Sequence, residues 1–135
     1  MDLSTRCLLP GFAAGEALVL AEPLSMWGGL DPKTGAIIDT RHPQLGEVVA
    51  GRILVMPAGR GSSSSSSVLA EAIRLGTAPA AIVLAAPDEI VLMGAIVAEE
   101  LYGITCPILV VDQTLFDRLT TGMALEVTEH GVFGQ

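Results

Sequence analysis

Residues 53–76 read ILVMPAGRGSSSSSSVLAEAIRLG, and this stretch decides the fold. The apolar segment that leads into it begins at Val48, bends at Gly51-Arg52, and predicts a strand region that Pro57 ends. A glycine-rich turn and six serines follow, and apolar residues then recur at helical spacing until Gly76 stops the helix. A strand, a turn and a helix in this order predict one β-α unit of a parallel sheet.

The same alternation continues toward the C-terminus. Three further apolar runs predict strands, at residues 80–85, 107–111 and 123–128. A helix is expected from Pro87-Asp88 to about Tyr102, and because it is apolar on most faces we expect it to be well buried. Asp112 is expected to cap a short helix that ends at Arg118. The resulting order, β-α-β-α-β-α-β, predicts right-handed crossovers and a parallel sheet.

The first third of the chain is strand and turn material without helices. Residues 1–25 are typical of strands, residues 27–35 are dense in turn formers, and residues 36–39 predict a short strand. The sequence has no linker and no internal repeat, so we expect one domain over residues 1–135. An α/β domain whose layers are made of both strands and helices fits the two halves of the chain.

Composition and charge exclude several classes of partner. Half of the residues are apolar and 4% are aromatic, so the core must be built from Ala, Val, Leu and Ile. A net charge of −8, with 7 basic and 15 acidic residues, argues against nucleic-acid binding and against an anionic membrane surface. The longest apolar stretch, residues 79–87, is too short to span a bilayer. The high mean hydropathy fits an exposed apolar patch for an obligate partner, and it fits a core rich in Ala and Val equally well.

The cysteines and histidines predict no metal site in this chain. Cys7 and Cys106 lie far apart, and no CxxC or Cys/His spacing is present. The N-terminal residues lack the apolar core of a signal peptide, which favours a cytoplasmic protein in which a disulfide is not expected. His42 and His130 belong to no recognisable triad, so we expect structural or surface roles for both.

The turn Gly59-Arg60-Gly61-Ser62 has the properties of an anion-binding site. A helix N-terminus offers unpaired N–H groups and a partial positive charge, and glycine lets a ligand approach the backbone closely. Arg60 adds a full charge suited to a carboxylate or a phosphate. The turn is not a P-loop, because no lysine follows Gly61. The alternative is a serine N-cap followed by a flexible serine linker, which explains one serine but not six.

Trp27 next to Gly28-Gly29 has two open interpretations: it lines the site or a partner surface, or it packs within its own turn. Asp31 and Asp39 are expected to shape turns. Three methionines, Met56, Met93 and Met123, are expected in the core.

Six segments together resemble the small subunit of aconitase X. These segments are residues 27–35, WGGLDPKTG; 38–43, IDTRHP; 51–57, GRILVMP; 59–66, GRGSSSSS; 78–83, APAAIV; and 95–103, AIVAEELYG. The resemblance extends from about Gly15 to Val111. It implies a three-layer swivelling β/β/α domain like the mobile C-terminal domain of aconitases.

The resemblance also implies a function. Members of this family are hydro-lyases that dehydrate hydroxy acids in the cytoplasm, active only with a large subunit that holds an iron–sulfur cluster, so this chain would bind no cofactor itself. The first serine after Gly-Arg-Gly is the family's proton acceptor, which corresponds to Ser62. Arg60, Gly61, Ser63 and Ser64 would then bind the small anionic substrate.

Two substrates remain open. The uninterrupted serine run favours cis-3-hydroxy-L-proline, converted to 1-pyrroline-2-carboxylate, and the alternative is mevalonate 5-phosphate. A non-catalytic anion-binding module is the alternative from another class. A stand-alone serine hydrolase is disfavoured, because the chain has no GxSxG elbow.

Overall fold

The computed structural model describes residues 5–60 and 63–135 of the chain. Within these residues the strands form one seven-stranded sheet in the order β1-β5-β4-β3-β2-β6-β7. The strands are β1 Thr5–Leu9, β2 Ala13–Val19, β3 Ile53–Met56, β4 Ala81–Leu84, β5 Ile108–Val111, β6 Ala124–Thr128 and β7 Gly131–Gly134. The helices are α1 Met26–Gly29, α2 Ser65–Leu75, α3 Glu89–Tyr102 and α4 Gln113–Arg118.

The centre of the sheet is parallel, as predicted. Strands β2, β3, β4 and β5 run in the same direction, with Ile53 opposite both Ala17 and Ala81. The carboxyl ends of these strands therefore lie at one edge of the sheet. The prediction for the C-terminal end was incomplete, since β6 returns to pair antiparallel with β2, and β7, which was not predicted, pairs antiparallel with β6.

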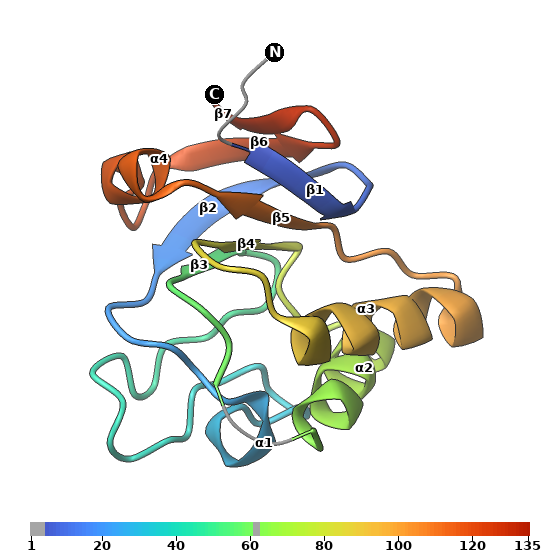
Figure 1. Ribbon diagram of the computed structural model, residues 1–135. Helices are drawn as coiled ribbons and strands as arrows, with labels where there is room; N and C mark the ends of the chain where they lie inside the picture. The colour runs from blue at the N-terminus through green and yellow to red at the C-terminus, as the bar shows by residue number, and fades with distance from the viewer. Residues whose placement is uncertain (1–4, 61–62) are drawn as a thin grey trace.

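Two apolar clusters separate three layers, which confirms the β/β/α architecture. Along β3 the side chains alternate, so that Leu54 and Met56 belong to one cluster and Ile53 and Val55 to the other. The first cluster fills the space between the sheet and helices α2 and α3, and the second lies within the curled sheet and includes residues of β6. Figure 1 shows β6 and β7 at the top, the parallel strands in the middle, and α2 and α3 below.

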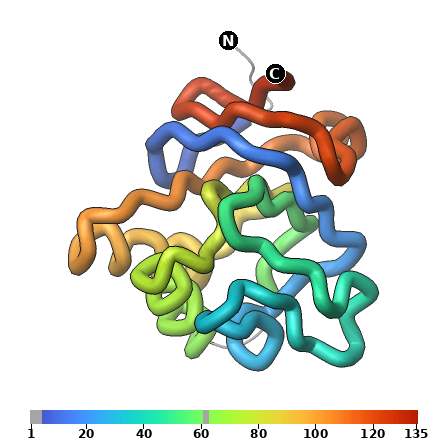
Figure 2. The backbone as a smooth tube through the Cα atoms, turned by 180° about the vertical axis from the view of Figure 1, so that it is seen from behind, coloured from blue at the N-terminus to red at the C-terminus, as the bar shows by residue number. Residues whose placement is uncertain are grey.

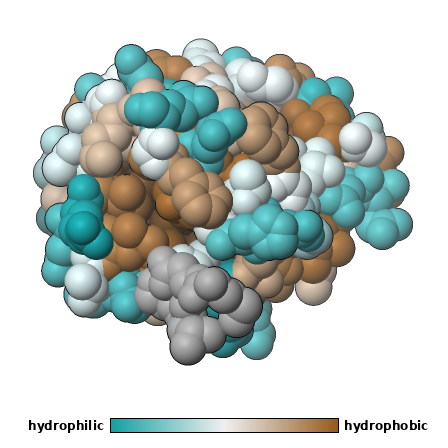
Figure 3. Space-filling view, turned by 90° about the horizontal axis from the view of Figure 1, so that it is seen from above, coloured by the Kyte–Doolittle hydropathy of each residue, from teal (hydrophilic) through white to brown (hydrophobic). Residues whose placement is uncertain are grey.

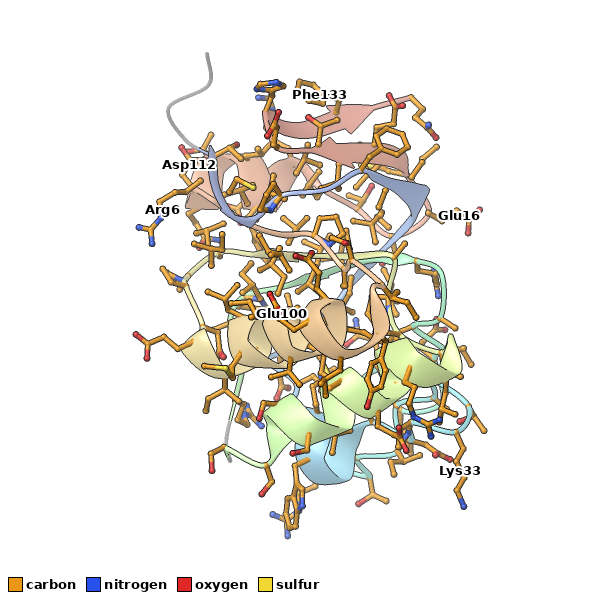
Figure 4. The ribbon with its side chains drawn as sticks, turned by 90° about the vertical axis from the view of Figure 1, so that its right-hand side faces the viewer. Arg6, Glu16, Lys33, Glu100, Asp112 and Phe133 are labelled. Atoms are coloured by element: carbon orange, nitrogen blue, oxygen red, sulfur yellow. The ribbon has the colours of Figure 1, made fainter. Side chains whose placement is uncertain are left out.

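The sheet curls toward a barrel. Strands β1 and β7 stand at the two ends of the strand order and nevertheless contact each other. Viewed from the side, Figure 4 shows Phe133 and Asp112 at this strand end of the molecule, and Lys33 at the opposite end near α1 and α2. Figure 3 looks onto the strand end, where apolar side chains gather around a hollow bordered by polar ones.

Helix α3 lies on the outside of the molecule, so the prediction that it is well buried was wrong. The buried residues of α3 are Val91, Gly94, Ala95 and Ala98, on the side that packs against α2 and the sheet. Met93 and Leu101 are 53% and 67% exposed. A helix in an outer layer can bury only one face, and apolar residues on its other faces stay in solvent. Of the three methionines expected in the core, Met56 is buried, whereas Met93 and Met123 are exposed.

Apart from α1, residues 20–50 form irregular loops beside the start of α2. Isolated bridges join Leu30 to Ile37 and Ala36 to Val48, so the strand expected at 36–39 is reduced to single pairs. A further parallel bridge pairs Leu24 with Gly59. Figure 2 shows these blue-to-teal loops in the lower half of the molecule, away from the two termini. The segment that follows β2 therefore lies alongside the segment that follows β3.

Candidate functional site at the carboxyl edge of the sheet

Three loops meet at the carboxyl edge of the parallel strands. The loop after β2 contributes Ser25 and Trp27, the loop after β3 contributes Gly59 and Arg60, and the loop after β4 contributes Asp88. Ligands of open parallel sheets bind outside the carboxyl ends of the strands, where the loops diverge. Gly59 and Arg60, the described half of the predicted turn, lie at this edge.

The structure describes the residues before and after Gly61-Ser62 in the serine turn. Gly61 and Ser62 lie outside the described residues, so the assignments of anion binding to Gly61 and of proton acceptance to Ser62 stay predictions. Ser63 and Ser64 are exposed immediately before α2. Ser65 to Ser67 form the first turn of that helix, where Ser66 Oγ donates to Ser63 O at 2.9 Å. These three serines are therefore helical, which contradicts a flexible linker at this part of the run.

Ser65 joins α2 to the loop after β2. Its side chain is buried, with 3% of the residue exposed. Ser65 Oγ accepts a hydrogen bond from Trp27 N at 3.1 Å and lies 3.2 Å from Ser25 Oγ. Ser25 Oγ in turn donates to Trp27 O at 3.0 Å. The start of the helix and residues 25–27 are thus held together by side-chain hydroxyls.

Gly59 and Asp88 join the turn to the start of α3. Asp88 is the N-cap of α3, and its Oδ1 accepts from Val91 N at 2.8 Å. The other carboxylate oxygen, Oδ2, lies so close to Gly59 that a Cβ at this position would overlap it. Glycine is therefore required here for close packing, and the segment that follows β3 is held next to the N-terminus of α3.

Arg60 is positioned in solvent at the edge of the site. Its side chain is 53% exposed, and Nη2 lies 4.0 Å from Glu22 Oε1, the limit of an ion pair. Exposed pairs of this kind contribute about 0–1 kcal/mol, so the guanidinium is held only weakly by this contact. An anion that accepts two parallel hydrogen bonds from the Arg60 guanidinium would bind it more strongly than Glu22 does at 4.0 Å.

His42 has a structural role, as expected from the sequence. The residue is 5% exposed, and Nδ1 accepts a hydrogen bond from Gln44 N at 3.0 Å. The proton of the neutral ring must then be on Nε2, which donates to Glu22 O at 3.1 Å. His42 therefore supports the backbone of the loop after β2. His130 is exposed at the far end of the chain.

Trp27 is 59% exposed, which does not fit packing within its own turn. Gly28 after it has φ of 77°, a conformation that glycine adopts readily, and this lets the chain turn sharply behind the indole. Asp31 and Asp39 shape turns as predicted, since their Oδ1 atoms accept from Lys33 N and Arg41 N, both at 2.9 Å. Trp27 is thus left as an aromatic surface next to the serine turn.

The cysteines lie apart from this edge and are both free thiols. Burial raises the pKa of the Cys106 thiol to about 12. Burial, and to a smaller extent the charge of Glu129, raises the pKa of the Cys7 thiol. Within the described residues, no three His, Cys, Asp or Glu side chains gather in a way that would hold a metal ion. The described part of the chain therefore offers no ligand set for a cluster.

Sequence reasoning found the turn but missed Ser25 and Asp88. The signal for both is their place in a loop that follows a strand of the parallel sheet. Using that signal requires the strand order, because only adjacent parallel strands bring their following loops together. The sequence predicted the strand before Asp88 but not which strands lie next to it.

A three-layer β/β/α domain with a glycine-serine turn at its carboxyl edge defines the class of swivelling domains found in aconitases. The aconitase X swivel domain family matches residues 2–133, and the chain belongs to this family. None of the helices in residues 5–60 and 63–135 has the length and apolar character needed to cross a lipid bilayer.

Named relatives fall into two groups. The chain is 51% identical over 114 residues to the cis-3-hydroxy-L-proline dehydratase of Pseudomonas aeruginosa, which is 84% of this chain but 20% of that relative. It is 41% identical over 98 residues to the phosphomevalonate dehydratase small subunit of Methanothermobacter thermautotrophicus, 73% of this chain and 75% of that one. The chain thus spans a fifth of the first relative and most of the second.

A solved structure has the same fold. A chain of the aconitase X from Thermococcus kodakaraensis, in its holo-form, superposes with a TM-score of 0.87 at 34% identity. The match covers 98% of this chain and 96% of that one.

Proposed function

We propose that this chain is the swivelling part of an aconitase X-type dehydratase, and that it acts together with a larger part that holds an iron–sulfur cluster. The observation that carries the proposal is the 51% identity to a named dehydratase over 84% of this chain. The chain spans 20% of that relative, so four-fifths of the relative's length has no counterpart here. The remaining catalytic groups would come from a partner subunit.

In this proposal Ser62 is the base. Its hydroxyl, as an alkoxide, removes the carbon-bound proton next to the substrate carboxylate. The electron pair of that C–H bond forms the new C=C bond, and the neighbouring C–O bond breaks with loss of the hydroxyl, which leaves as water after taking a proton. Arg60 and the N–H groups at the start of α2 favour the negative charge of both the serine and the substrate.

The cluster chemistry belongs to the partner. When bound in the large subunit, an iron–sulfur cluster supplies a Lewis acid for the leaving hydroxyl. Cys7 and Cys106 do not fit as its ligands, because both are separated from the serine turn and Cys106 is buried. This chain's part is to bind, to orient and to accept the proton, and closure of the swivelling domain would exclude water.

For the substrate we propose cis-3-hydroxy-L-proline, since the named relative for this compound has the higher identity, 51% against 41%. Loss of its α-proton and 3-hydroxyl gives an enamine that tautomerises to 1-pyrroline-2-carboxylate. Mevalonate 5-phosphate is the second candidate. The observation in its favour is length, because this chain covers 75% of a phosphomevalonate dehydratase small subunit.

The test is to co-express the chain with a large subunit of the aconitase X family and to assay the purified complex on both compounds. We expect product from cis-3-hydroxy-L-proline and little or none from mevalonate 5-phosphate. Turnover of the phosphate compound alone would reverse the substrate assignment. A complex that dehydrates neither, while the isolated chain binds carboxylate or phosphate in calorimetry, would favour the anion-binding module.

A further inference from the structure

The hydroxyls of Ser25 and Ser65 form a closed hydrogen-bonded ring with the backbone of Trp27. Ser25 Oγ–H donates to Trp27 O at 3.0 Å, which uses the one proton of that hydroxyl. In the 3.2 Å contact between the two hydroxyls, Ser65 must then be the donor and Ser25 the acceptor. Ser65 Oγ also accepts from Trp27 N at 3.1 Å. Each hydroxyl donates once and accepts once, so the direction of every proton is fixed.

This ring holds the C-terminal side of the serine turn. Ser65 is three residues after Ser62, and at 3% exposure its hydroxyl is inside the protein and out of a substrate's reach. The N-terminal side of the same turn is held where Gly59 pairs with Leu24. Both sides of the turn are therefore fastened to one segment, residues 24–27. Between these two points lie Arg60 and the residues proposed to act on the substrate.

We infer that Ser65 is a positioning residue of the dehydratase: its hydroxyl fixes the first turn of α2 against residues 25–27, and so holds in place the start of the helix that follows the proposed base in the chain. The inference rests on the proposed function. Holding two separate segments of the chain in one relative position costs conformational entropy, which the three hydrogen bonds of the ring offset. A displacement of about 1 Å of a reacting group can lower the rate on the order of 100-fold.

The test uses the complex of this chain with its large subunit, carrying Ser65→Ala, Ser25→Ala or both. We expect Ser65→Ala to lower kcat roughly 10- to 100-fold while KM changes less than about 3-fold, because the group that contacts the substrate is still present. Since both serines act through one ring, the fall in kcat of the double variant should be little larger than that of Ser65→Ala alone. Ser67→Ala, an exposed serine on the same helix, is the matched control and should behave as wild type.

A second readout does not depend on activity. Removal of the Ser65 hydroxyl takes away the acceptor of the Trp27 amide, so hydrogen exchange at this amide should become about 3- to 10-fold faster in Ser65→Ala and stay unchanged in Ser67→Ala. Ser65→Thr, which keeps a hydroxyl, should restore slow exchange. If Ser65→Ala does not fold, Ser25→Ala opens the same ring from its more accessible side and should give the same split between kcat and KM.

The outcomes separate the two proposals. Unchanged kcat in Ser65→Ala, strictly multiplicative losses in the double variant, or unchanged exchange at Trp27 would each overturn the positioning role. A wild-type complex without dehydratase activity would overturn the proposed function and with it a role in that reaction. In that case faster Trp27 exchange in Ser65→Ala would still establish the ring.

Discussion

At the scale of single residues, the described serines of the run differ in their contacts and in their exposure to solvent. Ser65 is buried in a hydrogen-bonded ring, and Ser66 donates back to Ser63 O. Ser67 is exposed on the helix surface. Identical residues in sequence thus have different environments, because a helix begins within the run and turns each successive serine toward another direction.

Replacement of Ser62 by Ala should remove the proposed base and leave assembly intact. General-base catalysis contributes typically 10²- to 10⁴-fold, so we expect kcat for cis-3-hydroxy-L-proline to fall by about that factor. The measurement is steady-state kinetics of the purified complex, with gel filtration to show that both subunits remain associated. Ser67→Ala serves as the control, and wild-type kcat in Ser62→Ala would rule out the catalytic role.

Replacement of Gly59 by Ala should destabilise the domain, because the added methyl group would overlap Asp88 Oδ2. Overpacking of this kind costs typically about 1–3 kcal/mol, measured here as the loss in free energy of unfolding by denaturant titration. Gly134→Ala is the control, since a Cβ there meets no atom within 4 Å.

A second change identifies the cause. Asp88→Ala removes both the carboxylate and the Cγ atom that a Cβ at Gly59 would meet, and the loss of the N-cap lowers stability alike with and without Gly59→Ala. Gly59→Ala should therefore cost less in the Asp88→Ala background than in the wild type. Equal costs in the two backgrounds would show that the clash is not with Asp88.

At the scale of elements, the sequence predicted the repeated β-α units well and the edges of the sheet poorly. Helix α3 ends at Gly103, which has φ of 67°, and α4 is capped by Asp112, whose Oδ1 accepts from Leu115 N at 2.8 Å. These are local signals. Strand β7 has glycine at both ends and, among the residues that the structure describes, pairs only with β6, so its formation depends on a neighbour that periodicity does not reveal.

Helix α3 shows that an apolar pattern does not predict which face of a helix is buried. Its residues are apolar on most faces, yet Ile96 is 37% exposed while the adjacent Ala95 is 0% exposed. Composition alone could not tell which face packs against α2, because that depends on the position of the helix in the outer layer. The same limit applied to the site, where Ser25 and Asp88 became apparent only once the strand order was known.

The two neighbouring residues of α3 give a matched test of this placement. Ile96→Gln should change the free energy of unfolding by about 0.5 kcal/mol or less, as expected for an exposed position. Ala95→Gln should cost more than about 2 kcal/mol, because a larger polar side chain would have to enter the apolar cluster in which Ala95 is buried. Denaturant titration of both variants measures the difference, and similar losses for the two would mean that α3 packs with another face.

At the scale of the whole molecule, the buried Cys106 thiol links folding to pH. Its pKa is raised from 9.0 to about 12 by burial, so the folded protein keeps the proton that the unfolded chain loses above pH 9. The resulting stability is complete below pH 9 and is lost as pH rises toward 12. The free energy of unfolding should therefore fall by about 1.4 kcal/mol per pH unit in this range from this group alone.

Cys106→Ala isolates that contribution. The variant should be less stable than the wild type at neutral pH, because a buried side chain is truncated, but its stability should fall less steeply between pH 9 and 12. Cys7→Ser is the comparison for the partly exposed thiol. An unchanged slope in Cys106→Ala would show that the thiol does not titrate with unfolding.

The arrangement of the termini bears on how the two parts of the proposed enzyme are connected. The described chain begins with β1 and ends beside β7, both at the strand end of the molecule, whereas α1 lies at the other end, where Leu24 pairs with Gly59 (Figure 1). A covalent connection at the strand end would therefore leave the site edge uncovered. In the Pseudomonas aeruginosa relative, the segment that matches this chain is 20% of a longer chain.

Fusion of this chain to its large subunit by a flexible glycine-serine linker at the strand end should therefore preserve activity. A linker converts association into an intramolecular step with an effective concentration in the millimolar range. On dilution, the specific activity of the two-chain complex should fall once the concentration passes below its dissociation constant, whereas that of the fusion should stay constant. Activity per molecule measured over a dilution series distinguishes the two. A fusion that is inactive with a long linker, although the separate chains are active together, would mean that the strand end itself docks on the partner.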